Sequence, residues 1–222
     1  MLCDLQRCFL CTHCQPEWKE LIALRKQTQS FKKGQAIFSE GDPVEGIYFM
    51  YAGAVKVHHR WGADKELILH FALPGDVLGY RGRDGETYPV SATALEPTVA
   101  CFIPMAFLEA SFQSNSRFLY RMMQLYADAL QQAERRMRHL ALTEVRGRTA
   151  DALFAIRDAF GVNAGGFIAL AITRQDIASY AGTTYETVFK LFTEWAAQGW
   201  IETSGKFIRI LNETGLRAFI PR

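Results

Sequence analysis

This sequence lacks several features that would place it in a common class of exported or membrane protein. No run of eighteen apolar residues occurs anywhere in the 222-residue chain, so we do not expect a transmembrane helix. The first residues carry Asp4, Arg7 and four cysteines where a secretory signal would carry an apolar segment. We therefore expect a cytoplasmic protein that has no membrane partner.

The sequence also lacks a strong net charge and the common catalytic motifs. Its 25 basic and 23 acidic residues give a net charge of +2, which neither requires nor excludes a polyanionic partner. No P-loop, dinucleotide fingerprint, Ser-His-Asp order or paired-carboxylate site stands out, so we do not expect an enzyme. The apolar fraction of 49% is sufficient to build a sizeable core.

The five cysteines are distributed unevenly along the chain. Four of them, Cys3, Cys8, Cys11 and Cys14, fall within the first fourteen residues, whereas Cys101 is far away in sequence. In a reducing compartment, clustered cysteines are more often metal ligands or redox groups than structural disulfides. The alternatives are a tetrahedral zinc site with His13 as a substitute ligand, a dithiol–disulfide switch, and a Cys101 that is only a small buried apolar residue.

Residues 31–110 consist of short apolar runs that are separated by turn signals, most of them glycine. Glycine adopts positive φ angles without a steric cost, so these positions predict tight corners. Many short strands at this spacing are typical of a small barrel or sandwich. We expect helices on either side of it, in "PEWKELIALRKQ" and "PMAFLEASF".

Residues 116–142 show the apolar period of one long helix. About 27 residues at 1.5 Å each make a rod of roughly 40 Å, which is longer than a small domain needs. We predict that its apolar seam pairs with the same helix of a second subunit, as in a coiled coil. The alternative is a core helix that lies on the barrel. The predicted seam consists of Leu119, Met122, Tyr126, Ala129, Ala133, Met137 and Leu140.

Residues 143–222 are predicted to form a helix, a short strand in "GGFIALAIT", two further helices and a hairpin. A capping box of Thr173 and Asp176 begins the first of the two helices, and Thr184 caps the second after a tight turn at Gly182. The hairpin is expected to turn at Ser204-Gly205. Two short helices followed by a hairpin are typical of a winged helix-turn-helix, which reads DNA.

Eight side chains of this module are predicted to contact DNA. Glutamate can accept from cytosine N4, lysine can donate to guanine O6 and N7, and phenylalanine can pack on a thymine methyl. The alternative is a winged domain that binds protein, which would suit its nine basic and eight acidic residues. The predicted reading residues are Tyr185, Glu186, Phe189 and Lys190, and the predicted phosphate contacts are Thr173, Arg174, Thr187 and Lys206.

The order of barrel, long helix and winged helix-turn-helix resembles the CRP/FNR superfamily of bacterial transcription regulators. The matching stretches are "KKGQAIFSEGD", "IYFMYAGAVKV", "LPGDVLG" and "ITRQDIASYAGTTYETVFKLF". Glu186 matches the family's base-reading glutamate, and Lys190 stands where an arginine is usual. The resemblance implies a homodimer that binds a double-stranded DNA operator and regulates transcription, with RNA polymerase as a further partner.

The resemblance also implies an α+β fold with four parts. They are a cysteine-rich sensor segment (1–17), a β-roll or jelly-roll barrel like a cyclic-nucleotide-binding domain (18–115), a dimerisation helix (116–142) and a winged helix-turn-helix (143–222). The cyclic-nucleotide branch of the superfamily uses an arginine before a Ser or Thr to bind phosphate. Here Pro89-Val90 precede Ser91, so the main charge-assisted partner of a phosphate is missing. A small effector bound in the β-roll is the alternative function.

The FNR-like branch instead holds an oxygen-labile [4Fe–4S] cluster on three N-terminal cysteines and one barrel cysteine. The resemblance to this branch implies Cys8, Cys11 and Cys14 as ligands, with Cys101 in "TVACFIP" as the fourth and Cys3 as an alternative. It further implies that cluster assembly orders the N-terminal segment and stabilises the dimer, and that oxygen or nitric oxide reverses this. We expect the cluster to be lost in aerobic preparation.

Overall fold

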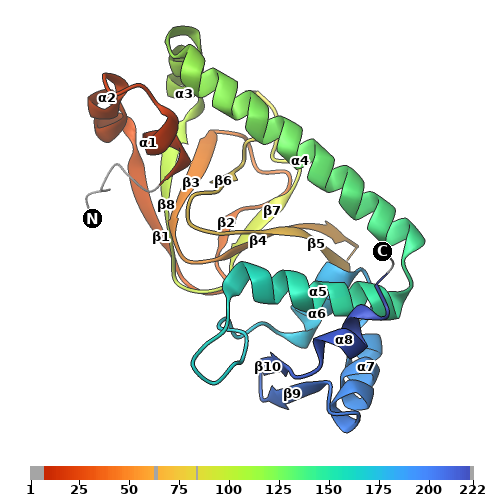
Figure 1. The fold of residues 1–222 in the computed structure, drawn as a ribbon. Helices are drawn as coiled ribbons and strands as arrows, with labels where there is room; N and C mark the ends of the chain where they lie inside the picture. Colours follow the sequence, from red (N-terminus) through yellow and green to blue (C-terminus); the bar gives the residue numbers. More distant parts are fainter. Residues whose placement is uncertain (1–7, 63–64, 84, 221–222) are drawn as a thin grey trace. The chain divides into compact units, whose positions relative to one another are not determined.

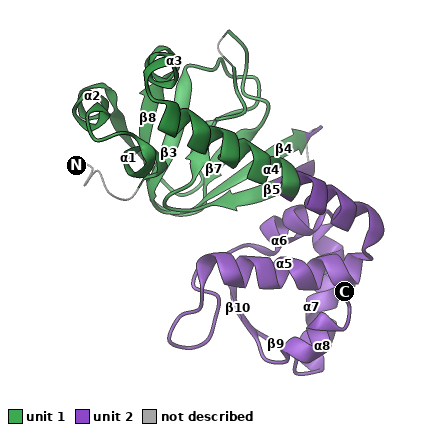
Figure 2. Cartoon of the chain, turned by 45° about the horizontal axis from the view of Figure 1, so that its top comes forward, with its two compact units in different colours: residues 1–60, 69–131 green, residues 61–68, 132–222 purple. Residues whose placement is uncertain are grey.

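The computed structural model describes residues 8–62, 65–83 and 85–220, and the chain divides into two compact units (Figure 2). Unit 1 comprises residues 1–60 and 69–131, and unit 2 comprises residues 61–68 and 132–222. The long helix α4 (Ser116–Leu142) contributes residues to both units and matches the helix predicted from its apolar period. Within the described ranges, no helix combines the length and the apolar character that crossing a bilayer requires.

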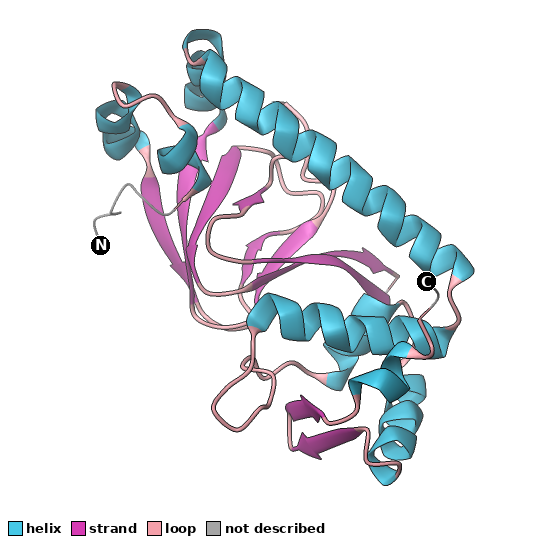
Figure 3. Cartoon of the chain, viewed as in Figure 1, coloured by secondary structure: helices cyan, strands magenta, loops and turns pink. Residues whose placement is uncertain are grey.

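Two four-stranded sheets form the predicted β-roll (Figures 1 and 3). The strand order is β1-β8-β3-β6 in one sheet and β2-β7-β4-β5 in the other. Cys101 lies on β8 at the centre of the first sheet, opposite Thr28 on one neighbour and Phe49 on the other. The strands are β1 (Gln27–Phe31), β2 (Ala36–Phe38), β3 (Gly46–Ala52), β4 (Val55–Trp61), β5 (Lys65–Ala72), β6 (Val77–Leu78), β7 (Ser91–Ala94) and β8 (Thr98–Pro104).

Aromatic side chains fill part of the interior of the β-roll. Phe38 stacks on Tyr88 with 4.1 Å between ring centroids and on Tyr48 with 5.8 Å. The Tyr88 hydroxyl donates a hydrogen bond to the Gly46 carbonyl at 2.7 Å. A Cβ atom at Gly79 would lie 2.9 Å from the Tyr88 ring, and the φ angle there is 78°, so only glycine fits without strain. These contacts leave little free volume in this region of the roll.

Three helices accompany the β-roll in unit 1. Helices α2 (Trp18–Arg25) and α3 (Met105–Ser114) confirm the two predicted helices. Helix α1 (Phe9–His13) was not predicted, and it lies against β3. The first half of α4 packs on the same core, where Phe118 and Met122 are buried.

Unit 2 contains the predicted winged helix-turn-helix. The predicted helix that ends at Gly161 is confirmed as α5, and Gly161 has a φ angle of 70°. The two helices of the motif and the hairpin are also confirmed, although the hairpin turns at Gly205-Lys206, one residue later than predicted. The elements are α5 (Val145–Phe160), α6 (Arg174–Ala181), α7 (Tyr185–Ala197), β9 (Ile201–Ser204), β10 (Phe207–Ile210) and α8 (Glu213–Arg217).

The predicted strand in "GGFIALAIT" is wrong. Instead of a strand, this segment makes an isolated bridge between Val162 and Ile168 and a hydrogen bond from the Ile168 N–H to the Ile208 carbonyl at 2.8 Å. Gly166, with a φ angle of 76°, turns the chain two residues before Ile168. Its apolar residues Ile168 and Ile172 are nearly inaccessible to solvent, so the segment is a buried connection between elements.

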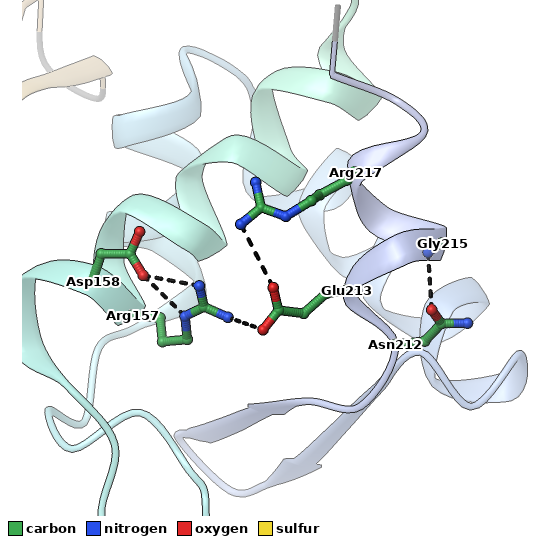
Figure 4. Close-up of polar contacts among 6 residues, drawn as sticks. All are labelled: Arg157, Asp158, Asn212, Glu213, Gly215 and Arg217. Carbon is green, nitrogen blue, oxygen red and sulfur yellow. Dashed lines mark hydrogen bonds and ion pairs between the residues drawn. The ribbon is translucent and has the colours of Figure 1, made fainter. Parts of the chain in front are cut away.

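Helix α8, which was not predicted, makes polar contacts with α5 (Figure 4) and also carries a buried leucine. Arg157 of α5 contacts Glu213 at 2.5 Å and Asp158 at 2.9 Å, and Asn212 caps α8 by accepting from the Gly215 N–H at 2.9 Å. These carboxylates are exposed, so the pairs contribute little to stability. The fully buried Leu216 supplies the main attachment.

Two arginines of unit 2 join the end of α4 to the helix-turn-helix. Arg148 of α5 donates to the carbonyls of Thr143 at 2.8 Å, Leu140 at 3.3 Å, Ala181 at 2.9 Å and Gly182 at 3.2 Å. Arg136 of α4 lies 3.9 Å above the Tyr180 ring and donates to the Tyr180 carbonyl. The carbonyls at the ends of α4 and α6 that lack helical partners are thereby satisfied by the same side chains.

Protonation of His70 is expected to destabilise the β-roll below neutral pH. Burial, with a smaller contribution from Arg81, lowers the pKa of His70 from 6.5 to about 4. The unfolded chain binds this proton near pH 6.5, so the folded state is most stable above that pH and loses stability as the pH falls towards 4. We expect His70→Gln to remove on the order of 1–2 kcal/mol of the stability difference between pH 7 and pH 5.

Chemical denaturation at both pH values measures this difference. His59→Gln is the matched control, because the side chain of His59 is 43% exposed and pairs only with Glu40 at the surface. The control should keep the pH dependence of the wild type. A His70→Gln variant that keeps the same pH dependence would show that this histidine does not govern it.

Candidate functional site

The structure buries Cys8, Cys11, Cys14 and Cys101 in the hydrophobic core of unit 1. Cys8 is the N-cap of α1 and accepts from the Cys11 N–H at 3.4 Å, and Cys14 follows the end of the same helix. Cys101 is on β8, next to the strand β3 against which α1 lies. None of the four is more than 4% exposed. Two distant segments of the chain thus bring four thiols into one water-excluded region.

Burial governs the electrostatics of these thiols. It raises the pKa of Cys14 to about 12, and the nearby Cys8 adds to this effect, whereas the Asn115 side chain and Lys19 oppose it. A thiolate at Cys14 therefore needs a compensating positive centre, which a bound metal supplies. Four sulfur donors in apolar surroundings fit an iron–sulfur cluster, because thiolates are its usual ligands.

The kind of metal centre that these thiols could hold depends on how far apart they stand. In the described part of the chain, no three His, Cys, Asp or Glu side chains are arranged to share one metal ion. A cubane cluster is larger than one ion, so its thiolates stand further apart than the four ligands of a tetrahedral zinc. Cys3, the alternative ligand, lies outside the described residues. Metal analysis separates the two kinds of centre.

Contacts with the start of α4 were missed by the sequence analysis. The ring of Phe9, in α1, meets the ring of Phe118 edge-on at 6.3 Å. Asn115, which immediately precedes α4, is fully buried and interacts with Cys14. The only signal for Asn115 was its place before a long helix, where asparagine is a favoured N-cap.

Threonine caps fix the two helices of the DNA-reading motif, as predicted. Thr173 and Asp176 form a full capping box, in which Thr173 Oγ1 accepts from the Asp176 N–H at 3.0 Å. Thr184 Oγ1 accepts from the Thr187 N–H at 3.3 Å and begins α7. Gly182 joins the helices in the left-handed conformation with a φ angle of 63°. Local hydrogen bonds thus set the angle at which α7 leaves the turn.

The four predicted reading residues are all exposed on α7. Tyr185 and Phe189 stack with 6.2 Å between their ring centroids, and the Arg174 guanidinium lies 5.9 Å from the Phe189 ring. Hydrogen bonds from its own backbone and from Thr184 lower the pKa of Glu186, so this side chain is ionised. The opposite face of α7 is buried through Val188, Leu191, Phe192 and Trp195.

A hollow of about 170 Å³ lies between α6, α7 and the β9–β10 hairpin. It is lined in part by Thr173, Arg174, Lys206 and Tyr185, so it gathers three of the predicted phosphate contacts beside one reading residue. The hydroxyls of Thr173 and Thr187 are engaged with Asp176 at 2.5 Å and with Thr184 at 3.1 Å. Arg174 and Lys206 are therefore the side chains best placed to meet a phosphate.

The predicted dimer seam is divided between two faces of α4. Met122 is 2% exposed within the core, Ala129 packs against that core, and Leu140 approaches Gly182, so these three do not form part of an exposed seam. The remaining predicted positions are exposed, together with Met123 and Leu130. The exposed stripe therefore alternates by four and three residues, as in a coiled coil: Leu119, Met123, Tyr126, Leu130, Ala133 and Met137.

Comparison with known proteins was made for the whole chain. Residues 28–115 match the family model for the cyclic nucleotide-binding domain, and residues 147–219 match the Crp-like helix-turn-helix domain. The chain is 32% identical over 221 residues to the transcriptional activator protein anr of Pseudomonas aeruginosa, covering 95% of this chain and 90% of that protein. It is 27% identical over 215 residues to the fumarate and nitrate reduction regulatory protein of Vibrio cholerae, covering 95% and 85%.

Solved structures give the same result for the fold. FixK2 from Bradyrhizobium japonicum superposes with a TM-score of 0.76 at 26% identity, over 89% of this chain and 98% of that one. The regulator CLP from Xanthomonas campestris superposes with a TM-score of 0.78 at 21% identity, over 87% and 97%. Both superpositions cover most of this chain and nearly all of the other.

Replacing Phe189 is expected to change which bases α7 prefers. If its ring packs on a thymine methyl, Phe189→Ala should weaken binding to an operator selected by the wild type. The same loss should follow when deoxyuridine replaces that thymine, because only a methyl group is removed. One methyl contributes about 1 kcal/mol, or roughly fivefold in affinity.

Fluorescence anisotropy with paired thymine and deoxyuridine duplexes measures this difference. The Phe189→Ala variant should no longer distinguish the two duplexes. Val162→Ala, which removes an apolar side chain that is 54% exposed outside α7, should distinguish them as the wild type does. Equal binding of both duplexes by the wild type would eliminate the methyl contact.

Proposed function

This chain belongs to the CRP/FNR superfamily of bacterial transcription regulators, within its FNR-like branch, and we propose that a [4Fe–4S] cluster controls its binding to DNA. The family and the relatives are transcription regulators rather than enzymes, and the Crp-like motif binds DNA. The observation that carries the proposal is the burial of four cysteines from two distant segments in the core of unit 1, where α1 lies against β3, the strand paired with the one that carries Cys101. The proposed ligands are Cys8, Cys11, Cys14 and Cys101.

The proposed ligands have separate structural tasks. Cys8 and Cys14 stand at the two ends of α1, so binding at both would hold the helix ends in place. Cys101 provides a fixed point, because its strand is paired on both sides. When bound, the cluster supplies an oxidisable inorganic centre whose stability depends on oxygen and redox state. The buried surroundings keep water from the sulfur atoms.

The interior of the β-roll supports a cluster rather than a cyclic nucleotide as the signal. The internal space lined by His70, Tyr88 and Pro89 has a volume of about 10 Å³, whereas small-molecule sites occupy roughly 300–1,000 Å³. Pro89 and Val90 face this space where the cyclic-nucleotide branch has a phosphate-binding arginine. The aromatic side chains of Phe38, Tyr48 and Tyr88 occupy the neighbouring volume.

In the proposed active form, two subunits pair along the exposed stripe of α4 and present two α7 helices to one operator. Symmetric half-sites then lie about one DNA turn, roughly 34 Å, apart. Glu186 and Lys190 would read base edges, while Arg174 and Lys206 would contact phosphates. RNA polymerase is the further partner that we propose, because the P. aeruginosa relative is named an activator.

We propose four functional parts along the chain. Residues 1–17 would act as the sensor segment, 18–115 as the β-roll, 116–142 as the dimerisation helix and 143–222 as the DNA-binding domain. The matches of family models to residues 28–115 and 147–219 support the second and fourth parts. In this arrangement, the sensor segment and the dimerisation helix meet at the start of α4.

Anaerobic purification is expected to yield a brown protein with about four irons per monomer. Replacing any one of Cys8, Cys11, Cys14 or Cys101 by serine should remove most of this iron, because each change removes one ligand. Cys3→Ser is the matched control and should retain it. Iron, zinc and acid-labile sulfide are measured on the same samples. A colourless wild-type protein without iron under strict anoxia would refute the cluster.

Leu130→Glu is expected to dissociate the dimer. Leu130 is 62% exposed in a single chain, and a partner would bury one added carboxylate from each subunit. We expect the dissociation constant to rise roughly 100-fold or more, as measured by anaerobic sedimentation equilibrium.

Two other substitutions on α4 test whether the effect depends on the position of the added charge. Tyr120→Glu adds the same charge at a residue that is exposed but lies outside the stripe, so it should leave the dimer intact. Met122→Glu should instead unfold unit 1, because Met122 is buried in the core of the chain itself. Dissociation by Tyr120→Glu with no effect of Leu130→Glu would contradict the assigned stripe.

A further inference from the structure

Asn115 occupies the junction where α3 ends and α4 begins. Its side-chain Oδ1 accepts from the Phe118 N–H at 3.1 Å, and its carbonyl accepts from the Leu119 N–H at 3.0 Å. Its own N–H donates to the Ser111 carbonyl at 2.8 Å. Asn115 is therefore the N-cap of the long helix as well as the last residue attached to α3.

The other end of the Asn115 side chain points to the sulfur site. The residue is fully buried, and its Nδ2 makes no hydrogen bond of ordinary geometry with any described residue. The Asn115 side chain nevertheless lies within interacting distance of Cys14. A buried N–H donor without an acceptor is costly. A thiolate at Cys14 would provide the missing acceptor, and hydrogen bonds to an ionised acceptor are the stronger kind.

Aromatic rings pack around the same junction between α3 and α4. Phe118, the residue whose N–H Asn115 caps, stacks on Phe112 of α3 at 5.5 Å and meets Phe9 of α1 at 6.3 Å. Phe9 lies between Cys8 and Cys11 in sequence and also contacts the His13 ring at 4.5 Å. The helix that carries the cysteines is thus packed against the first turn of α4.

We propose that Asn115 is a positioning residue that connects the sulfur site to the dimerisation helix, with Oδ1 capping α4 and Nδ2 donating to the metal-bound thiolate of Cys14. This inference rests on the proposed function, since the thiolate exists only when a metal centre is bound. One rigid amide then joins the charge on the sulfur to the first turn of α4. The positive end of the helix dipole at that turn favours the same negative charge.

The test separates capping from donation to sulfur. Asn115→Ser and Asn115→Asp keep an oxygen that can cap α4, because Ser, Asp and Asn are N-caps of similar strength, but neither has an amide N–H. Asn115→Ala loses both functions. Asn212→Ser is the matched control, since Asn212 caps α8 (Figure 4) and belongs to unit 2, whereas the four described cysteines belong to unit 1.

Each variant is reconstituted under anoxia as the full-length protein. Three quantities are compared with the wild type: the rate of iron release to a ferrous chelator, the midpoint reduction potential and the melting temperature of the metal-free protein. We expect the Ser and Asp variants to release iron about 10-fold faster or more. Their reduction potentials should fall, because a donor to sulfur stabilises the more negative reduced state.

The melting temperature of the metal-free protein reports the cap alone. It should stay near the wild-type value for Asn115→Ser and Asn115→Asp and fall for Asn115→Ala. Asn212→Ser should change neither the iron release nor the potential. A purely structural role for Asn115 would lower the melting temperature of all three variants while leaving the potential unchanged, and that result would overturn the inference.

The outcomes for the inference and for the proposed function are distinguishable. A wild-type protein that binds no iron removes the proposed function and this inference together. A wild-type protein that loads its cluster, with Ser and Asp variants that release iron at the wild-type rate and keep the wild-type potential, removes only the role of Asn115. Faster release and a lower potential in both variants, with unchanged melting, support the connection.

Discussion

Helix α4 must bury apolar side chains on two faces, and much of the rest of the molecule depends on this constraint. One face, with Phe118 and Met122, completes the core of the β-roll. The other face carries an exposed stripe that alternates by four and three residues from Leu119 to Met137. One face is therefore packed within its own unit, whereas the other is exposed and would meet the second subunit in the proposed dimer.

The position of the cysteines follows from how the β-roll is filled. Stacked aromatic rings and a proline occupy part of the interior, where an effector would need space. The proposed sulfur site combines a short helix, α1, with the paired strand β8, and α1 meets the first turn of α4 through Phe9 and Phe118. Under the proposed function, a change at the sulfur atoms would reach α4 through these short contacts without a rearrangement of the sheets.

Sequence reasoning succeeded where local chemistry determines structure. The Thr173–Asp176 capping box, the left-handed Gly182 and the cap at Thr184 are all set by neighbouring residues, and all three were predictable. It failed where burial depends on distant residues. Met122 and Met123 are adjacent and both apolar, and the helical period could not show which one faces the core. The strand expected around Ile168 and the role of Asn115 likewise depend on contacts with segments far away in sequence.

The Arg148 clamp has a consequence for how this architecture can diversify. Its guanidinium binds the backbone carbonyls of Leu140, Thr143, Ala181 and Gly182, and none of these bonds involves a neighbouring side chain. Every residue, proline included, offers a backbone carbonyl. Apart from Gly182, which is left-handed and where a Cβ atom would lie 2.8 Å from the Leu140 side chain, the joint therefore places little demand on the identities of the residues it binds. Mutations that retune the reading face of α7 for new operators can accumulate without loosening the attachment of the motif to the helix that precedes it.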